Sequence, residues 1–217
     1  MAQAQANIQD DDSLVEYGFR RVIITITAIL CALLEIIDTT IVNVALNDMR
    51  GSLGATLTDV AWVITAYAIA NVIVIPMTSW LSKQFGRRNY FAASIILFTV
   101  SSFLCGNATN IWELVTFRFI QGMGGGALLV TAQTIITEVY PIKKRGMAQA
   151  IYGMGVIVGP TLGPPLGGYL VDNFSWPYIF YINIKKSSMF HNPVVIFIRI
   201  GRVNTEKIMI LRKLMNQ

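Results

Sequence analysis

The chain contains few residues of the types that catalysis and metal binding require. Its 217 residues include one histidine, His191, and two cysteines, Cys31 and Cys105. This inventory excludes a histidine-based triad within the apolar part of the chain and a metal site of clustered histidine and cysteine. The two cysteines have no paired spacing, so the pattern favours neither a disulfide nor a metal centre. We therefore expect no catalytic residue, no metal site and no cofactor.

Charged residues are also scarce, at 13% of the chain against 54% hydrophobic residues, and the mean hydropathy is +0.56. That balance excludes an ordinary soluble domain and is typical of a membrane protein. The net charge of +5 arises at the end of the chain, because residues 185–217 hold seven Lys and Arg against one Glu. A basic segment beside a membrane more often attracts anionic lipid than DNA. We expect membrane lipids, and no nucleic acid, as partners.

Five apolar runs are each long enough to cross a bilayer, which needs about 20 residues per helix. They are continuous rather than short and alternating, so they predict helices and not barrel strands. A sixth run begins near Trp176, but Lys185 and Lys186 interrupt it after nine residues. We predict an all-α transmembrane fold with spans at 22–46, 60–81, 90–106, 111–139 and 147–171.

Basic residues fall in alternate loops of this arrangement. Because positive residues in short loops are retained on the cytoplasmic side, the pattern predicts a cytoplasmic N-terminus. The first apolar run is too long for a signal peptide and has no clear cleavage site, so we expect it to stay as a span. The basic residues are Arg20, Arg21, Lys83, Arg87, Arg88, Lys143, Lys144 and Arg145.

Six motifs follow one another along the predicted spans. They are IDTTIVNVAL, WVITAYAIANVIVIP, WLSKQFGRRNYF, RFIQGMGGG, GPTLGPPLGG and SWPYIFYIN. Together they resemble the N-terminal part of the major facilitator superfamily, and within it the drug:proton antiporters of the fourteen-helix EmrB/QacA type. The resemblance covers residues 20–183 and implies the first half of a major facilitator fold, multi-pass in the inner membrane.

The resemblance also implies an activity, namely proton-coupled multidrug efflux. The implied partners are protons, a small lipophilic substrate and a periplasmic adaptor protein. A cationic drug suits the acidic residues of the first span, while fatty acids, siderophores and sugars stay open as substrates. A membrane-embedded scaffold without transport is an alternative from a different class.

The segment between the second and third spans resembles the family's cytoplasmic hairpin motif. Gly86 supplies the conformational freedom for a tight turn, and Arg87 and Arg88 anchor that turn at the membrane interface. The family motif usually starts with Gly and often has an acidic residue where Ser79 and Lys83 stand here.

The end of the chain departs from the family. The run at 194–200 is too short to span a membrane and contains Arg199. We divide the chain into a cytoplasmic segment at 1–20, a transmembrane bundle at 21–184 and a divergent basic tail at 185–217. Our interpretation is a truncated copy, inactive alone or completed by another chain. An evolved amphipathic cytoplasmic tail is the alternative.

Two carboxylates, Glu35 and Asp38, lie one helical turn apart in the first span and can face the same interior groove. A charge in mid-membrane costs at least about 2.5 to 3.5 kcal/mol and often marks an ion or proton pathway. With a rise of about 1.5 Å per residue, Asp38 in the first span and Arg118 in the fourth lie at about the same depth in the membrane. The resemblance assigns proton coupling to Asp38 and Arg118, and we add Glu35 for its position. The alternative is that Asp38 and Arg118 only neutralise one another and hold two helices together.

Polar and glycine positions complete the candidate site. Polar side chains that face a groove can line a substrate site, and those considered are Tyr67, Asn71, Gln121 and Gln133. Glycines recur every four residues in the fifth span, and the resemblance gives this face a gating role, while close helix packing is the alternative. That motif consists of Gly155, Gly159, Pro160, Gly163, Pro164, Gly167 and Gly168.

Overall fold

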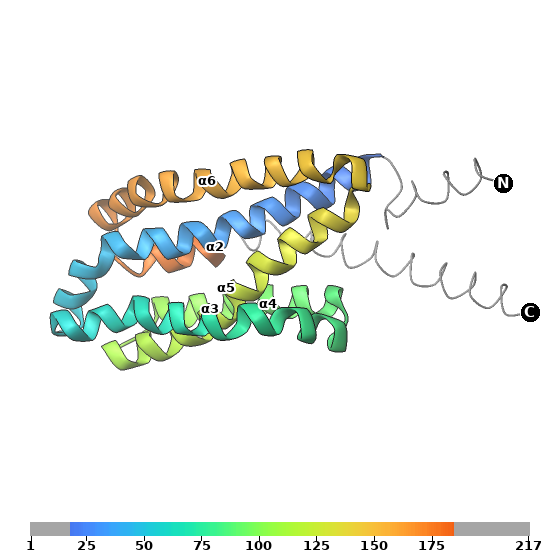
Figure 1. The fold of residues 1–217 in the computed structure, drawn as a ribbon. Helices are drawn as coiled ribbons and strands as arrows, with labels where there is room; N and C mark the ends of the chain where they lie inside the picture. Colours follow the sequence, from blue (N-terminus) through green and yellow to red (C-terminus); the bar gives the residue numbers. More distant parts are fainter. Residues whose placement is uncertain (1–17, 185–217) are drawn as a thin grey trace, which may run out of the picture.

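The computed structural model describes residues 18–184, which form a bundle of long helices (Figure 1). All five long helices are apolar enough to cross a membrane, as predicted. Residues 178–184 are also helical up to the last described residue, and the predicted tail at 185–217 lies outside the described residues. The long helices are α2 (Phe19–Ser52), α3 (Leu57–Phe85), α4 (Arg87–Gly106), α5 (Ile111–Val139) and α6 (Ile142–Asn173).

Each predicted span lies within one helix, but all except α5 extend beyond the predicted bounds. Apolar length marks the hydrocarbon core, whereas the helices continue to their capping residues. Thr56 and Asp59 form a reciprocal capping box at the start of α3, and the Asn110 side chain caps α5. Gly86, with a φ of 80°, ends α3 and lets α4 begin at the next residue.

The helices are arranged around α5, which packs along α3 and α4 and also contacts α2. Helix α6 packs mainly on α2, on the far side of the bundle from α3 and α4 (Figure 1). The segment at 178–184 joins the core through Ile179 and Phe180, which are fully buried, and the Tyr181 hydroxyl donates to the Gly106 carbonyl of α4 at 2.9 Å.

The apolar core forms two clusters, one toward each end of the bundle. On α2 the first cluster ends at Leu34 and the second begins at Ile37. On α5 the order is reversed: the second cluster includes Leu114, and the first cluster begins at Leu128. Glu35 of α2 and Arg118 of α5 therefore lie between the two clusters, and Asp38 lies at the edge of the second; all three side chains are buried.

Glycines allow α5 to approach two neighbours at once. A Cβ at Gly122 would lie 2.6 Å from the backbone oxygen of Tyr67 on α3. A Cβ at Gly124 would lie 2.8 Å from the backbone nitrogen of Phe98 on α4. The glycine run of RFIQGMGGG is thus required by close packing on two sides, as small residues commonly allow in membrane bundles.

Helix α6 uses its glycine face in the same way against α2. A Cβ at Gly167 would lie 2.9 Å from the Ile41 side chain and 3.1 Å from its carbonyl oxygen, whereas one at the neighbouring Gly168 would meet open space. We expect Gly167→Ala to lower the free energy of unfolding by about 1 to 3 kcal/mol through overpacking. Gly168→Ala is the matched control and should be neutral or stabilising by up to about 1 kcal/mol. Denaturant titration in detergent micelles, followed by circular dichroism, measures both; equal effects would show that the glycine face is not tightly packed.

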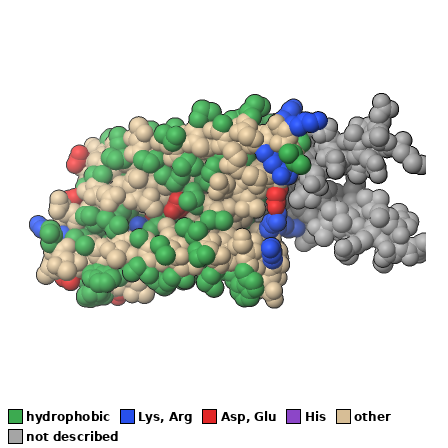
Figure 2. Space-filling model, in the orientation of Figure 1, with side chains coloured by type: hydrophobic (Ala, Val, Ile, Leu, Met, Phe, Trp, Pro, Cys, Tyr) green, Lys and Arg blue, Asp and Glu red, His purple; other side chains and the backbone are tan. Residues whose placement is uncertain are grey.

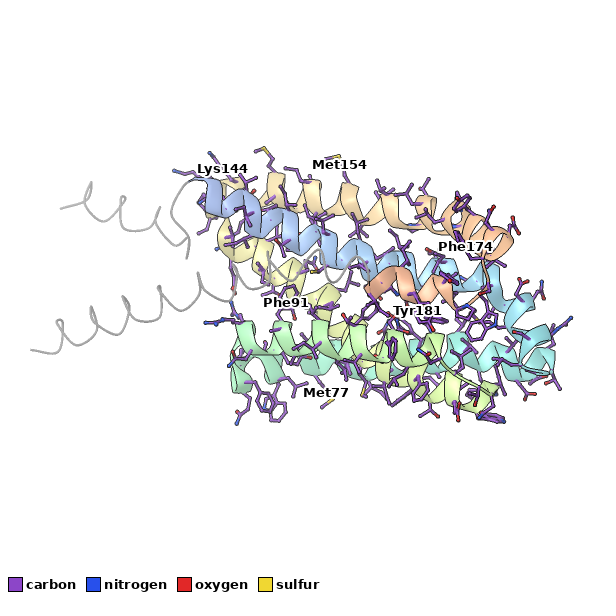
Figure 3. The ribbon with its side chains drawn as sticks, turned by 180° about the vertical axis from the view of Figure 1, so that it is seen from behind. Met77, Phe91, Lys144, Met154, Phe174 and Tyr181 are labelled. Atoms are coloured by element: carbon purple, nitrogen blue, oxygen red, sulfur yellow. The ribbon has the colours of Figure 1, made fainter. Side chains whose placement is uncertain are left out.

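The surface of the bundle is suited to lipid. Met77 and Met154 project outward from opposite sides (Figure 3), and both are exposed. Lys and Arg gather at the end where α2 begins and where α3 meets α4 (Figure 2). At that end Arg87 forms an ion pair with Glu138 of α5. An apolar waist with a basic rim is typical of a membrane protein.

Candidate functional site

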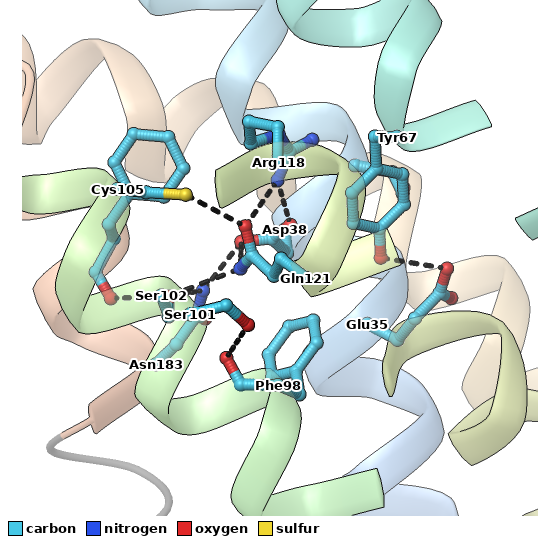
Figure 4. A network of polar contacts seen from close by, with 12 residues as sticks. Glu35, Asp38, Tyr67, Phe98, Ser101, Ser102, Cys105, Arg118, Gln121 and Asn183 are labelled. Carbon is cyan, nitrogen blue, oxygen red and sulfur yellow. Dashed lines mark hydrogen bonds and ion pairs between the residues drawn. The ribbon is translucent and has the colours of Figure 1, made fainter. Parts of the chain in front are cut away.

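The centre of the bundle holds a buried ion pair. Arg118 Nη1 of α5 donates to Asp38 Oδ2 of α2 at 2.5 Å, and both side chains are at most 1% exposed. The contact predicted from their equal depth is therefore present (Figure 4). An unpaired charge buried away from water costs several kcal/mol, so each of these two groups is stabilised by the other.

Two amides complete the coordination of Asp38. Gln121 Nε2 donates to Asp38 Oδ1 at 3.0 Å, and Asn183 Nδ2 donates to the same oxygen at 2.5 Å. Each amide also donates to the Ser102 hydroxyl, at 3.2 and 3.1 Å. Ser102 in turn donates to the carbonyl of Phe180 at 3.0 Å. The carboxylate thus receives donors from α5 and from the segment at 178–184.

Gln121 also connects the ion pair to α4. Its Oε1 accepts from Arg118 Nη1 at 2.9 Å and from Cys105 Sγ at 3.5 Å. With the two bonds from its nitrogen, this one side chain contacts residues of α2, α4 and α5. The structure places Gln121 inside the ion-pair network, fully buried. Its predicted role in a substrate groove stays a prediction.

The Arg118 guanidinium contacts aromatic rings as well as the Asp38 carboxylate. Its Cζ lies 4.1 Å from the centroid of the Tyr67 ring and 5.7 Å from that of Phe180. Its Nε donates to the Val63 carbonyl at 3.5 Å. A desolvated cation over an aromatic face is stabilised by about 2 kcal/mol or more, so Tyr67 adds to what Asp38 provides.

Glu35 lies beside this network in a different setting. The Tyr67 hydroxyl donates to Glu35 Oε1 at 3.3 Å, and Asn71 Nδ2 donates to the same atom at 3.5 Å. Tyr67 therefore contacts Arg118 with its ring and Glu35 with its hydroxyl (Figure 4). Both carboxylates of α2 and the arginine of α5 thus belong to one connected cluster, to which we refer as the central cluster: Glu35, Asp38, Tyr67, Asn71, Ser102, Arg118, Gln121 and Asn183.

Other predicted site residues lie apart from the central cluster. Gln133 is exposed on α5, and its place in a substrate groove stays a prediction. Pro160 and Pro164 are exposed on α6, away from the glycine face that meets α2. Close packing accounts for that face, and gating stays a prediction. On the glycine face, Gly155, Gly159 and Gly163 lie against Ile29, Ile36 and Thr40 of α2, whereas Gly168 meets open space. Arg87 and Arg88 open α4 directly after the turn at Gly86.

Two residues of the central cluster, Ser102 and Asn183, were not predicted from the sequence. Ser102 stands in an apolar span beside Ser101, and Asn183 is the last residue of the SWPYIFYIN motif. A buried asparagine at the end of an apolar run was a usable signal for Asn183, because an amide in mid-membrane needs a partner. Nothing in the local sequence distinguishes Ser102 from Ser101.

Comparisons with known proteins agree with this architecture. Residues 28–184 match the family described as Major Facilitator Superfamily. The chain is 42% identical over 167 residues to the multidrug export protein EmrB of Escherichia coli (strain K12), a match that covers 77% of this chain and 33% of that protein. It is also 42% identical over 161 residues to the fatty acid resistance protein FarB of Neisseria gonorrhoeae, covering 74% and 32%. The chain therefore spans about a third of the length of these relatives.

A solved structure shows the same fold at low sequence identity. The crystal structure of a D-xylose-proton symporter superposes with a TM-score of 0.70 at 18% identity, over 80% of this chain and 47% of that one. The family match covers more than half of the chain. The chain belongs to the major facilitator superfamily and is a multi-pass protein of the inner membrane, with relatives of the EmrB/QacA export type.

Proposed function

We propose that the chain is the N-terminal bundle of a proton-driven exporter that moves small lipophilic molecules out across the inner membrane. The observation that carries the proposal is the buried pair of Asp38 and Arg118 with a second acid, Glu35, beside it. Ionisable groups inside a membrane protein usually mark proton or substrate pathways. The relatives at 42% identity that are named as multidrug exporters favour export over uptake.

The proposed orientation follows from the basic rim of the bundle. The rim at the start of α2 and at the α3–α4 turn faces the cytoplasm by the positive-inside rule. Alternating access needs two bundles that move about a site near the midplane, so this bundle acts with a second one. A periplasmic adaptor protein stays a predicted partner on the opposite face.

A cationic substrate suits the charges of the central cluster. With both acids ionised, Glu35, Asp38 and Arg118 together carry one net negative charge. A lipophilic cation that enters the site would balance that charge, and a proton on one acid would do the same. Competition between the two for one site is the simplest form of exchange. The relative named for fatty acid resistance keeps an anionic substrate as a second candidate.

A chimera tests the proposal. The matched 167 residues of E. coli EmrB would be replaced by those of this chain, and the product placed in vesicles with an imposed pH gradient. We expect gradient-driven movement of a fluorescent lipophilic cation, and its loss when Glu35→Gln and Asp38→Asn are combined. The exposed acid of the same helix, Asp48→Asn, is the matched control.

Three results would count against the proposal. A folded chimera without gradient-driven movement of the cation or of a fatty acid would remove the transport function. Transport that is unchanged in the Glu35→Gln, Asp38→Asn double variant would leave the central cluster with a structural role. A stable oligomer of the chain with no transport phenotype would favour the membrane scaffold instead.

A further inference from the structure

The two acids of α2 have unequal surroundings, although both are buried. Asp38 accepts three hydrogen bonds, and one comes from the permanently charged Arg118 at 2.5 Å. The guanidinium in direct contact and the two amide donors occupy both oxygens of this carboxylate. Protonation of Asp38 would leave Arg118 buried without its charge partner.

Glu35 has neutral donors in place of a cationic one. Its hydrogen bonds come from Tyr67 and Asn71 at 3.3 and 3.5 Å. The titratable and charged groups that face it are Asp38 on α2, Tyr67 on α3, Arg118 on α5 and Tyr152 on α6. Arg118 is already committed to Asp38, and Asp38 itself disfavours a second negative charge nearby.

We propose that Glu35 is the carboxyl group that takes up and releases the exchanged proton, while Asp38 stays paired with Arg118 as its anchor. This inference rests on the proposed function and differs from the role that the family resemblance gives to Asp38. In the uptake step a proton from water forms an O–H bond with a Glu35 carboxylate oxygen. In the release step that bond breaks and the proton returns to water, with no change in redox state.

Tyr67 positions Glu35 relative to the ion pair. Its hydroxyl contacts Glu35 Oε1 while its ring covers Arg118, so a change of charge at Glu35 acts on a residue that also touches the arginine. Gly125 of α5 makes room for this contact, because a Cβ there would collide with the Tyr67 hydroxyl and lie 3.2 Å from Glu35 Cγ. Tyr67 is a positioning residue in this account, and it holds no proton of the cycle.

Infrared difference spectroscopy of the full chain in lipid nanodiscs tests the assignment without any need for transport. A pH change should produce a carbonyl band from a protonated, buried carboxyl group. We expect Glu35→Gln to remove that band and Asp48→Asn to leave it in place. Tyr67→Phe keeps the aromatic ring and should shift the frequency and the pH midpoint of the band, which a purely structural role would not do.

The outcomes separate this inference from the proposed function. If the carboxyl band survives in Glu35→Gln, the inference is overturned. If the band also disappears in a folded Asp38→Asn variant, the proton belongs to Asp38. If Asp38→Asn does not fold, the Glu35→Gln result decides alone. If the infrared band belongs to Glu35 but the chimera transports no substrate, the inference about the proton holds and the proposed export function does not.

Discussion

Asp38→Asn is expected to lower the free energy of unfolding of the bundle by about 3 to 5 kcal/mol, the usual result of removing one member of a buried ion pair. The loss is large because Arg118 is 1% exposed and would keep a buried charge without an acid in contact. Denaturant titration in detergent micelles measures it. The exposed acid of the same helix, Asp48→Asn, should stay within about 0.5 kcal/mol of the parent.

A double-mutant cycle shows that the loss comes from the pair. Arg118→Met removes the stranded charge, so the double variant Asp38→Asn, Arg118→Met should be less destabilised than the sum of the two single variants. Additive effects would mean that the two groups do not interact. A loss for Asp38→Asn as small as that for Asp48→Asn would contradict the buried geometry itself.

Gln121→Leu is expected to have the second largest effect, a loss of about 3 kcal/mol or more in the free energy of unfolding. Leucine has a similar size but no polar atoms, so Asp38, Ser102 and Arg118 would each lose a hydrogen bond from this side chain. A buried polar group left without its partner costs about 1 to 3 kcal/mol. Denaturant titration under the same conditions gives the comparison.

Gln133→Leu is the matched control, because it makes the same change on the same helix. Gln133 is exposed, so its replacement should be near neutral and slightly favourable in a lipid environment. Equal losses at positions 121 and 133 would show that the amide network adds no stability. The comparison also tests whether Gln133 has any part in the site.

The sequence was sufficient for the spans and for the meeting of Asp38 with Arg118. Both predictions use lengths that physics sets, the thickness of the hydrocarbon core and the rise per residue of a helix. Ends of helices were less predictable, because α2 continues to Ser52 beyond the last apolar residue of its predicted span. Interfacial turns are stabilised by caps and not by hydropathy.

The partners of Asp38 were harder to predict, since they depend on tertiary packing. Asn183 is 145 positions away from Asp38 in sequence and reaches it because the segment at 178–184 lies against α2 and α4. Gln121 seemed suited to a groove, yet its position one turn from Arg118 places it in the ion-pair network. Helix periodicity assigns a residue to a face but does not tell which neighbour covers that face.

The most direct test of the account is proton release by the chimera on binding a lipophilic cation. In weakly buffered detergent solution, addition of tetraphenylphosphonium should release protons from the parent and from Asp48→Asn, while Glu35→Gln should bind the cation without releasing any. Binding of the cation with no proton release in the parent would contradict exchange at the central cluster. Equal release in Glu35→Gln would contradict the assignment of the exchanged proton to Glu35.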